Sequence, residues 1–570
     1  MPEPSHPGGY YENEFLLTLT VPANGTIYYT LDGSEPTASS QKYSDGIYLQ
    51  DRSQEPNRYL SRKNLIKNWL DYEPDPAPVP KATVLRAIYV NSLGVCSDIL
   101  TQTYFIGIAP PEFGYTLSLI GDEEAIFGND GLYVTGTEYD NWLLSGAPAD
   151  AEPIPNFNKR LEVPVIAEFF LNSSGNSVNW PVSLRLQGNS MRGSLLKRFI
   201  MESSAELSGS NVFPFEVFPG TATHSLMTKD NAIDAMIHEL VSDRNVATTQ
   251  SVPVSVYING EFFYRWYLLE RYDNQYFRQH YGVDNTMLIK NAVPDPDVPE
   301  SAGAYGEMMY WIAHTDYSDP AQWEQLNKEV DIQSYIDYIS INYYLCNWDF
   351  SDDKNCLLWR SVEQDTTAYG DCRWRWCIYD IDAIDFSYRK FDIEPAEINI
   401  FSCELPYSPV KVNETVLFRA LREHPEFRQQ FVLSFMDIVN NNFSSQRVEQ
   451  ILRNHNLDLS WHNGFFEKRP AYAAAHLAEE FGLSGSLETV TVISNQPSMG
   501  SVCVNTSVID LSSGSWTGSY FTDYPITLTA LPKEGYEFIG WKGAASGSDH
   551  TLTVPVDGGI TLEAVFAKTE

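Results

Sequence analysis

The sequence is short of positive charge. Lys and Arg together number 38 against 75 Asp and Glu, which gives the 570-residue chain a net charge of −37 at pH 7. Such a chain repels phosphate backbones and anionic lipid surfaces, so nucleic acid is not an expected partner. No apolar run approaches the roughly 18 residues of a membrane-spanning helix, so we expect no transmembrane segment. The start, Met-Pro-Glu-Pro, lacks the charged and apolar regions of a signal peptide. Either the protein stays in the cytoplasm or the chain begins after a removed signal.

Cysteine is also scarce. The chain has seven, with no CxxC pair, which argues against a zinc knuckle and a dense disulfide scaffold. Buried thiols are expected, and a single bridge such as Cys372 to Cys377 stays open. HExxH, GxSxG and GxxxxGK[ST] motifs are absent, so zinc-protease, hydrolase-elbow and P-loop chemistry have no sequence support.

The patterns that are present divide the chain into three segments. Residues 1–107 contain two stretches of alternating apolar and polar residues, 25–37 and 82–90, and the tight-turn pair Asp32-Gly33, which together predict a small β-sandwich. A helix is expected in an insertion at 61–70. Residues 486–570 are again β-patterned, and residues 108–485 are mixed.

The middle segment predicts strands first and helices later, the order of an α+β domain. Apolar spacing and turn signals predict strands at 182–187 and 197–202 joined by a loop, a helix over 230–244 with Asp230 as its N-cap, a hairpin of 252–258 and 261–270 around Asn259-Gly260, a helix at 332–344, a strand at 374–379 and helices over 414–451.

Carboxylates in this segment are the candidates for chemistry. Asp349, Asp352, Asp353 and Asn355 follow the predicted helix at 332–344, and Asp380-Ile-Asp382 follows the predicted strand. Burying unpaired acids beside apolar residues is costly, and a hard cation such as Mg²⁺ or Mn²⁺ removes that cost when carboxylates and an amide oxygen bind it. The structural alternative is a solvated acidic turn and a strand-end cap.

Both flanking segments resemble accessory modules of bacterial extracellular proteins. Residues 28–37, Tyr-Tyr-Thr-Leu-Asp-Gly-Ser-Glu-Pro-Thr, resemble the signature of the immunoglobulin-like chitobiase/β-hexosaminidase C-terminal-like domain. The C-terminal motifs at 535–542 and 561–566 resemble InlB B-repeat-like modules, which are small and β-grasp-like. The resemblance implies a secreted or cell-surface protein, with a surface glycan as a partner for the N-terminal module.

The middle segment resembles the CotH kinase family, the spore-coat protein H-like proteins. The resemblance rests on four motifs in order, at 185–197, 257–270, 347–360 and 379–382. It implies a two-lobed, atypical protein-kinase-like fold. The implied activity is metal-dependent transfer of the γ-phosphoryl group of ATP to Ser or Thr of a protein acceptor, with Mg²⁺ or Mn²⁺ as cofactor.

In that interpretation each motif has a role. Lys197 holds the ATP phosphates, supported by Arg185 and Arg192, and its acidic partner is Glu239 or Glu270. Asp349 accepts the proton of the substrate hydroxyl, although Asp352 and Asp353 leave the identity of the base open. The metal ligands are Asn355, Asp380 and Asp382.

Two other functions stay open. One is a catalytically inert kinase-like scaffold that acts as a surface or glycan-adhesion protein, as the flanking modules and the 13% aromatic content suggest. The other is a glycoside hydrolase that uses two of these carboxylates.

Overall fold

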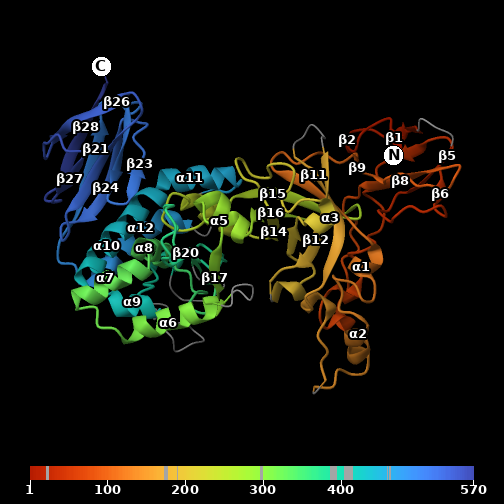
Figure 1. The fold of residues 1–570 in the computed structure, drawn as a ribbon, viewed down its shortest axis with the longest axis horizontal. Coiled ribbons are helices and arrows are strands. Elements are labelled where there is room, and N and C mark those ends of the chain that lie inside the picture. Colours follow the sequence, from red (N-terminus) through yellow and green to blue (C-terminus); the bar gives the residue numbers. More distant parts are fainter. Residues whose placement is uncertain are drawn as a thin grey trace. The chain divides into compact units, whose positions relative to one another are not determined.

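The protein is described here by a computed structural model. The structure describes residues 1–20, 25–149, 151–171, 177–188, 190–294, 300–384, 394–402, 415–458, 460 and 464–569. The chain divides into two compact units, Met1–Ala232 with Thr249–Gln279 and Ile233–Thr248 with His280–Glu570 (Figure 1). Helices and sheets are both present, which confirms a mixed α and β fold.

The first unit begins with a β module. Its largest sheet has the strand order β2-β9-β8-β5-β6, and two short pairs, β3-β7 and β1-β4, accompany it. Their inward side chains, such as Leu17, Ile27, Leu85 and Tyr104, form one buried cluster. The immunoglobulin-like assignment stays a prediction. The strands are β1 (Glu3–Pro4), β2 (Gly9–Tyr11), β3 (Phe15–Leu17), β4 (Leu19–Thr20), β5 (Gly25–Thr30), β6 (Gln41–Lys42), β7 (Ile47–Leu49), β8 (Thr83–Asn91) and β9 (Leu100–Ile106).

A closed barrel follows in the same unit. Its described strands run in the order β10-β11-β12-β13-β14-β16-β15, and a parallel pairing of β10 with β15 closes it. Alternate side chains such as Leu117, Val165, Val182 and Val256 fill the interior. The strands are β10 (Tyr115–Ile120), β11 (Glu162–Phe170), β12 (Ser177–Leu186), β13 (Phe199–Glu202), β14 (Ser225–Lys229), β15 (Ser251–Ile258) and β16 (Glu261–Glu270).

Two predicted strand pairs are present in this barrel. β12 pairs with β13 in antiparallel register, with Ser183 opposite Glu202. The β15–β16 hairpin turns at Asn259 (φ 45°) and Gly260 (φ 84°), as a type I′ turn requires. A Cβ at Gly260 would lie 2.4 Å from the Ala82 carbonyl oxygen, so close packing as well as φ demands glycine.

The prediction of a helix at 61–70 is wrong. The chain forms two short 3₁₀ turns instead, η1 (Lys63–Leu65) and η2 (Trp69–Asp71). Leu65 is buried in the barrel cluster, and nearby backbone N–H groups of Tyr59 and Leu60 donate to the Glu261 carboxylate at 3.1 Å and 2.8 Å. Tertiary anchoring therefore overrides local helix propensity. The other short helices of this unit are α1 (Glu123–Phe127), α2 (Thr137–Leu144), η3 (Asn156–Asn158), η4 (Ser190–Gly193) and α3 (Ala205–Ser208).

The second unit contains most of the helices. The predicted helix at 332–344 is α8, with these same bounds, and α10 contacts both α8 and α12. The helix expected at 230–244 is the shorter α4, which begins at Ala232; Asp230 therefore is not its N-cap and instead accepts a hydrogen bond from Arg198 Nε at 2.8 Å. The helices are α4 (Ala232–Leu240), α5 (Asn274–Tyr281, which begins in the first unit), α6 (Glu300–His314), α7 (Pro320–Glu329), α8 (Ile332–Tyr344), η5 (Pro395–Glu397), α9 (Val416–Leu421), α10 (Pro425–Asp437), the π-helical turn η6 (Ile438–Asn442), α11 (Ser445–Asn454) and α12 (Phe465–Phe481).

The prediction of helices over 414–451 is confirmed by α9, α10 and α11, the first of which begins at Val416; residue 414 lies outside the described residues. A small sheet of order β18-β17-β19-β20 lies among the helices. The predicted strand at 374–379 is its short member β20. The strands are β17 (Thr286–Lys290), β18 (Val293–Pro294), β19 (Leu357–Ser361) and β20 (Arg375–Cys377).

The C-terminal module of this unit consists of two four-stranded sheets, β24-β21-β28-β26 and β23-β22-β25-β27. Its described residues contain no helix, so it differs from the β-grasp-like domain expected, in which a helix covers one sheet. Here strands of both sheets alternate buried and outward residues, and the buried side chains of the two sheets belong to one hydrophobic cluster. The strands are β21 (Leu487–Ser494), β22 (Gly500–Val504), β23 (Ser507–Ile509), β24 (Ser515–Phe521), β25 (Ile526–Pro532), β26 (Tyr536–Gly543), β27 (Thr551–Val554) and β28 (Ile560–Lys568).

Neither Cys372 nor Cys377 forms a disulfide, so the bridge left open between them is not present. Cys403 lies outside the described residues. Among the helices that the structure describes, none combines the length and the apolar character needed to cross a bilayer.

Candidate active site

One end of the small sheet gathers the predicted catalytic residues of the second unit. Lys290 of β17 lies opposite Leu357 of β19, and Leu357 lies opposite Cys377 of β20. Asn355 comes two residues before Leu357, and Asp380 comes three residues after Cys377. The antiparallel register therefore brings both residues to the same edge of the sheet.

Asp349 and Asn355 are in direct contact at this edge. The side-chain amide of Asn355 donates to the backbone oxygen of Asp349 at 2.8 Å and to its carboxylate at 3.2 Å. Lys354 forms an ion pair with the same carboxylate. Asn355 has a φ of 49°, a left-handed conformation that asparagine tolerates better than most residues. The loop is thus folded back so that the amide orients the acid.

The turn after β20 is hydrogen-bonded to this loop. The Trp348 backbone N–H donates to the Ala383 carbonyl oxygen at 3.3 Å, which places residues 347–349 beside residues 382–383. Asp380 has a φ of 51°, a left-handed conformation that is uncommon for residues other than glycine, although aspartate adopts it more readily than most. Residues held in sparsely populated conformations gather at functional sites, so this observation marks the turn as a candidate.

Sequence reasoning missed the residue that holds this turn. The carboxylate of Asp234 in α4 accepts a hydrogen bond from the Ile381 backbone N–H at 2.9 Å. Asp234 is 2% exposed. The available signal was an acid one turn before Ile237, at the edge of the apolar stripe of the predicted helix.

The two neighbouring acids have other surroundings. Asp352 accepts a hydrogen bond from the Val416 backbone N–H at 2.8 Å, at the start of α9. Burial raises the pKa of Asp352 to about 6. Asp353 is exposed and accepts a hydrogen bond from the Ser351 hydroxyl at 2.6 Å. Of the three acids, Asp349 is therefore the one that Asn355 orients.

Lys290 is a second residue that the sequence did not single out. It is exposed at the end of β17, and its ammonium lies 4.5 Å from the centroid of the Tyr379 ring, one residue before Asp380. A cation over an aromatic ring is held by the ring's negative face. The structure therefore places a lysine next to the Asp380 turn.

Lys197 lies in the first unit and is fully buried. Its ammonium donates to the carbonyl oxygens of Leu65 at 2.7 Å, Arg192 at 2.6 Å and Ser194 at 2.6 Å. An ammonium has three protons, so these bonds use all of its donors. Burial lowers the pKa of Lys197 to about 7, whereas the three carbonyl oxygens favour the charged form. The geometry is that of a structural cation, and phosphate binding by Lys197 stays a prediction.

The other predicted phosphate-site residues also have partners. Arg185 forms an ion pair with Glu202 at 2.8 Å, and Arg192 Nη1 contacts the Asn158 carbonyl oxygen at 3.5 Å. Glu270 accepts from the Gln250 backbone N–H at 2.9 Å. These contacts lie within the first unit.

Glu239 of α4 points toward α11 in the second unit. Its carboxylate accepts from Asn454 Nδ2 at 3.1 Å and contacts His455 Nε2 at 3.0 Å, and the hydrogen bond from His455 lowers the pKa of Glu239. The pairing of Glu239 with Lys197 stays a prediction.

The predicted metal ligands are two carboxylates and one amide oxygen. Within the described residues, no group of three or more His, Cys, Asp or Glu side chains is positioned to hold a metal ion. Asn355, Asp380 and Asp382 are not such a group, because one of the three is an amide. Their donor atoms are all oxygens, the type that Mg²⁺ and Mn²⁺ prefer, so the residues present fit such an ion chemically.

A pocket of about 400 Å³ lies toward the other end of the same sheet. Trp311 of α6 and Trp374 supply aromatic walls, and the Arg360 guanidinium lies 5.0 Å from the centroid of the Trp374 ring. Glu307, Gln325 and Glu329 complete the polar lining, with Ala304 and Met308. Within the described residues, Glu307, Glu329 and Arg360 take part in no ion pair.

Comparison with known families finds matches in the middle segment and in both flanking segments of the chain. Residues 229–457 match the CotH kinase protein family. The CotH match covers the Asp349 loop, the Asp380 turn, Asp234 and Lys290. It begins at Lys229, so Arg185, Arg192 and Lys197 lie outside it.

The flanking segments match two further models. Residues 17–104, where the N-terminal accessory module was expected, match the Fn3 associated model, and residues 504–570 match the divergent InlB B-repeat domain. The three matches confirm the predicted arrangement of a CotH region between two accessory modules. A comparison with curated proteins found no match.

Proposed function

We propose that the CotH-matching region is an atypical kinase that transfers the γ-phosphoryl group of ATP to Ser or Thr of a protein acceptor. The main support is the contact of Asn355 with Asp349, in a loop that is hydrogen-bonded to the Asp380 turn. Phosphoryl transfer depends on positioning and charge neutralisation, and this arrangement offers an oriented acid beside oxygen ligands. The two-lobed kinase-like architecture belongs to this proposal.

Asp349 is the proposed base. Its carboxylate accepts the proton of the acceptor hydroxyl, and the Asn355 amide keeps it in one orientation. Asn355 Oδ1 and the carboxylates of Asp380 and Asp382 are the proposed metal ligands. Lys290, next to the Asp380 turn, is the proposed phosphate-binding cation. Asp234 holds that turn through the hydrogen bond it accepts from the Ile381 N–H.

A divalent cation bound by these ligands would offset the negative charge of the triphosphate. Of the two ions, the donor set alone favours neither Mg²⁺ nor Mn²⁺. The Asp380 turn is held rigidly, because α4 and the 347–355 loop each form a hydrogen bond with its backbone. Such rigidity suits a turn that supplies metal ligands.

The accessory modules favour an extracellular location for the protein. Modules of the InlB B-repeat type and the CotH match together favour a secreted or surface-exposed protein, and we propose that location. The acceptor is then a Ser- or Thr-rich protein at the same surface.

A radiolabel transfer assay tests the activity. The full chain is incubated with ATP labelled at the γ-phosphate, Mg²⁺ or Mn²⁺, and a Ser-rich acceptor, with Asp349→Ala and Asp380→Ala as controls. We expect incorporation by the wild type and none by either variant. No incorporation into the acceptor or the protein itself with either metal would exclude the kinase.

A glycan-binding scaffold is the second candidate function, and the 400 Å³ pocket favours it. Trp311 offers a half-buried apolar face, and Glu307, Gln325, Glu329 and Arg360 offer donors and acceptors for hydroxyl groups. Affinity electrophoresis in gels that contain glycans tests it. Retardation of the wild type, lost in Trp311→Ala, with no nucleotide-induced thermal shift, would favour the scaffold over the kinase.

A further inference from the structure

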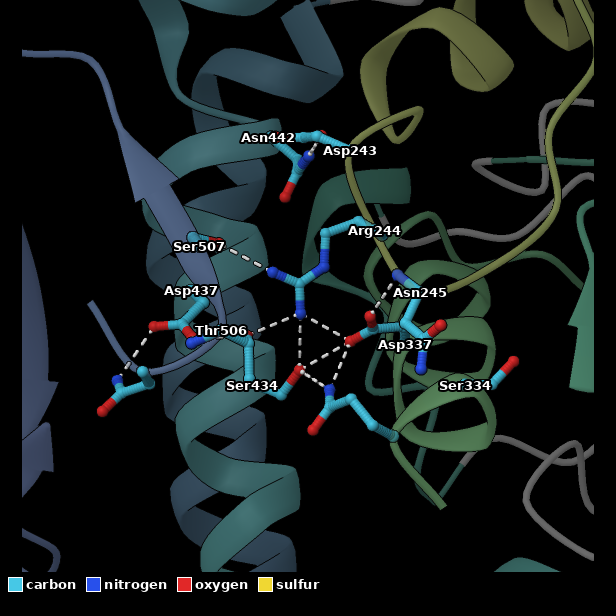
Figure 2. Close-up of polar contacts among 12 residues, drawn as sticks. Asp243, Arg244, Asn245, Ser334, Asp337, Ser434, Asp437, Asn442, Thr506 and Ser507 are labelled. Atoms are coloured by element: carbon cyan, nitrogen blue, oxygen red, sulfur yellow. Dashed lines mark hydrogen bonds and ion pairs between the residues drawn. The ribbon is translucent and has the colours of Figure 1, made fainter. Parts of the chain in front are cut away.

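The C-terminal module is joined to the CotH-matching region by a buried polar network. Arg244, which follows α4, forms an ion pair with Asp337 of α8 and donates to Ser434 of α10 at 2.8 Å (Figure 2). The same guanidinium donates to the Thr506 hydroxyl at 2.8 Å and to the Ser507 hydroxyl at 2.7 Å, both in the C-terminal module. Arg244 and Asp337 are nearly inaccessible to solvent, so the module's two hydroxyls supply hydrogen bonds to a buried charge.

A second buried charge repeats this arrangement. Asp437, at the end of α10, is 0% exposed. Its carboxylate accepts hydrogen bonds from Asn505 Nδ2 at 3.0 Å, from the Thr506 N–H at 2.9 Å and hydroxyl at 2.7 Å, and from the Tyr520 hydroxyl at 2.6 Å. These four donors all belong to the C-terminal module. A buried carboxylate without them would be left unsatisfied, so α10 and the module depend on each other.

The π-helical turn η6 extends the connection to both sides. Asn440 exchanges two hydrogen bonds with the Ser519 backbone, at 2.9 Å and 3.0 Å. Asn442 donates to the Leu240 carbonyl oxygen at the end of α4 at 2.9 Å and to the Asp243 carboxylate at 2.7 Å. The hydrophobic cluster of the helices also continues into both C-terminal sheets, through side chains such as Tyr520 of β24 and Val502 of β22. The module is therefore packed as part of the second unit.

Helix α4 links this network to the candidate active site. Its C-terminal end is bound through Leu240 and Arg244, as described above. In its first turn, Asp234 accepts the hydrogen bond from Ile381 that holds the turn at Asp380. A helix is a stiff element, so constraints at one end limit displacement at the other.

We infer that the C-terminal module is a positioning element for the candidate active site: Thr506 and Ser507 hold Arg244, and α4 carries that constraint to the Asp380 turn. The catalytic part of this inference rests on the proposed kinase function, and the structural part does not. Thr506 and Arg244 act through α4 and are positioning residues.

Hydrogen–deuterium exchange of the full-length protein tests the structural part. Thr506→Val removes the hydroxyl shared by Arg244 and Asp437 and keeps the side-chain shape. We expect amide exchange to rise at least fivefold in 233–240 and 378–384, with strands β11 and β12 unchanged. Thr529→Val is the matched control, because its hydroxyl contacts the Thr551 hydroxyl, at 3.3 Å, in the same module.

The inference is overturned if Thr506→Val and Thr529→Val show equal amide exchange in 233–240 and 378–384. A uniform rise over the whole second unit would also overturn it, because that would show general destabilisation. Ser507→Ala removes a single bond to Arg244 and gives a second variant if Thr506→Val folds poorly; the same two segments should respond, by a smaller factor.

The transfer assay then separates the two proposals. If Thr506→Val changes exchange at 378–384 and raises the KM for ATP at least threefold over Thr529→Val, both the positioning role and the kinase are supported. If exchange changes but neither variant nor wild type transfers phosphate, the kinase fails and the structural coupling stands.

Discussion

The Asn355 side-chain amide donates to the Asp349 carboxylate at 3.2 Å and to its backbone oxygen at 2.8 Å. This contact predicts that Asp349 is the base among the three neighbouring acids. We expect Asp349→Asn to lower the phosphoryl-transfer rate by about 10²- to 10⁴-fold, the usual contribution of a general base. Asn355→Ala should lower it by a smaller factor, because the acid stays but loses its orientation.

Asp353→Asn is the matched control, since this exposed acid contacts the Ser351 hydroxyl. Its transfer rate should stay within about twofold of the wild type, inside the range expected for a surface charge. Loss of transfer in Asp352→Asn or Asp353→Asn, with Asp349→Asn active, would move the base to one of the other two acids.

Asp380→Asn tests metal binding. Asparagine tolerates the left-handed conformation at φ 51° and lacks the negative charge, so the turn should survive without its ligand. We expect Mn²⁺ with ATP to raise the melting temperature of the wild type by several degrees, EDTA to reverse the rise, and the variant to show no rise.

Asp510→Asn, in an exposed turn of the C-terminal module, is the control and should behave as the wild type. An equal Mn²⁺-dependent rise in Asp380→Asn would show that the ion binds elsewhere.

A pair of lysine variants separates the two candidates for phosphate binding. Lys290→Met should weaken ATP binding about tenfold, which is roughly 1.4 kcal/mol, and leave stability unchanged. Lys197→Met should lower the free energy of unfolding by about 3 kcal/mol or more, because it removes the donor to three buried carbonyl oxygens.

Calorimetric titration of each folded variant with ATP is the measurement. If Lys197→Met loses ATP affinity and Lys290→Met keeps it, the role that the family resemblance implies for Lys197 is supported instead.

The features that were predicted from sequence depend on local chemistry. The β15–β16 hairpin follows from Asn259-Gly260, whose positive φ values few other residues adopt easily. Helix α8 follows from its apolar spacing and begins after Asp331, whose carboxylate accepts from the Ser334 N–H as an N-cap. Such signals lie within a few residues of the structure they specify.

What the sequence missed depends on contacts between distant positions. The parallel pairing that closes the barrel joins β10 to β15, and Lys197 finds an acceptor at Leu65. Arg244 is bound by hydroxyls at 506 and 507, more than 260 positions away. Hydrophobic periodicity carries no information on such pairs, so Asp234 and Lys290 were also overlooked.

Glu168 predicts how the stability of the first unit changes with pH. This carboxyl group is 0% exposed in β11 and accepts a hydrogen bond from the Ser177 hydroxyl at 2.9 Å. Burial raises its pKa from 4.5 to about 7. The folded state therefore holds the proton more tightly than the unfolded state, so stability is highest below pH 4.5, falls as pH rises through the folded pKa, and levels off above about pH 7.

Glu168→Gln keeps the shape and removes this titration. We expect the variant to gain stability relative to the wild type as pH rises from 4.5 to 7, by up to about 3 kcal/mol, with a constant difference above that range. Calorimetric melting from pH 4 to 8 measures it, with Glu162→Gln in the same strand as an exposed control. Parallel stability profiles of wild type and Glu168→Gln would show that Glu168 keeps an ordinary pKa, because only a shifted group makes the two curves diverge.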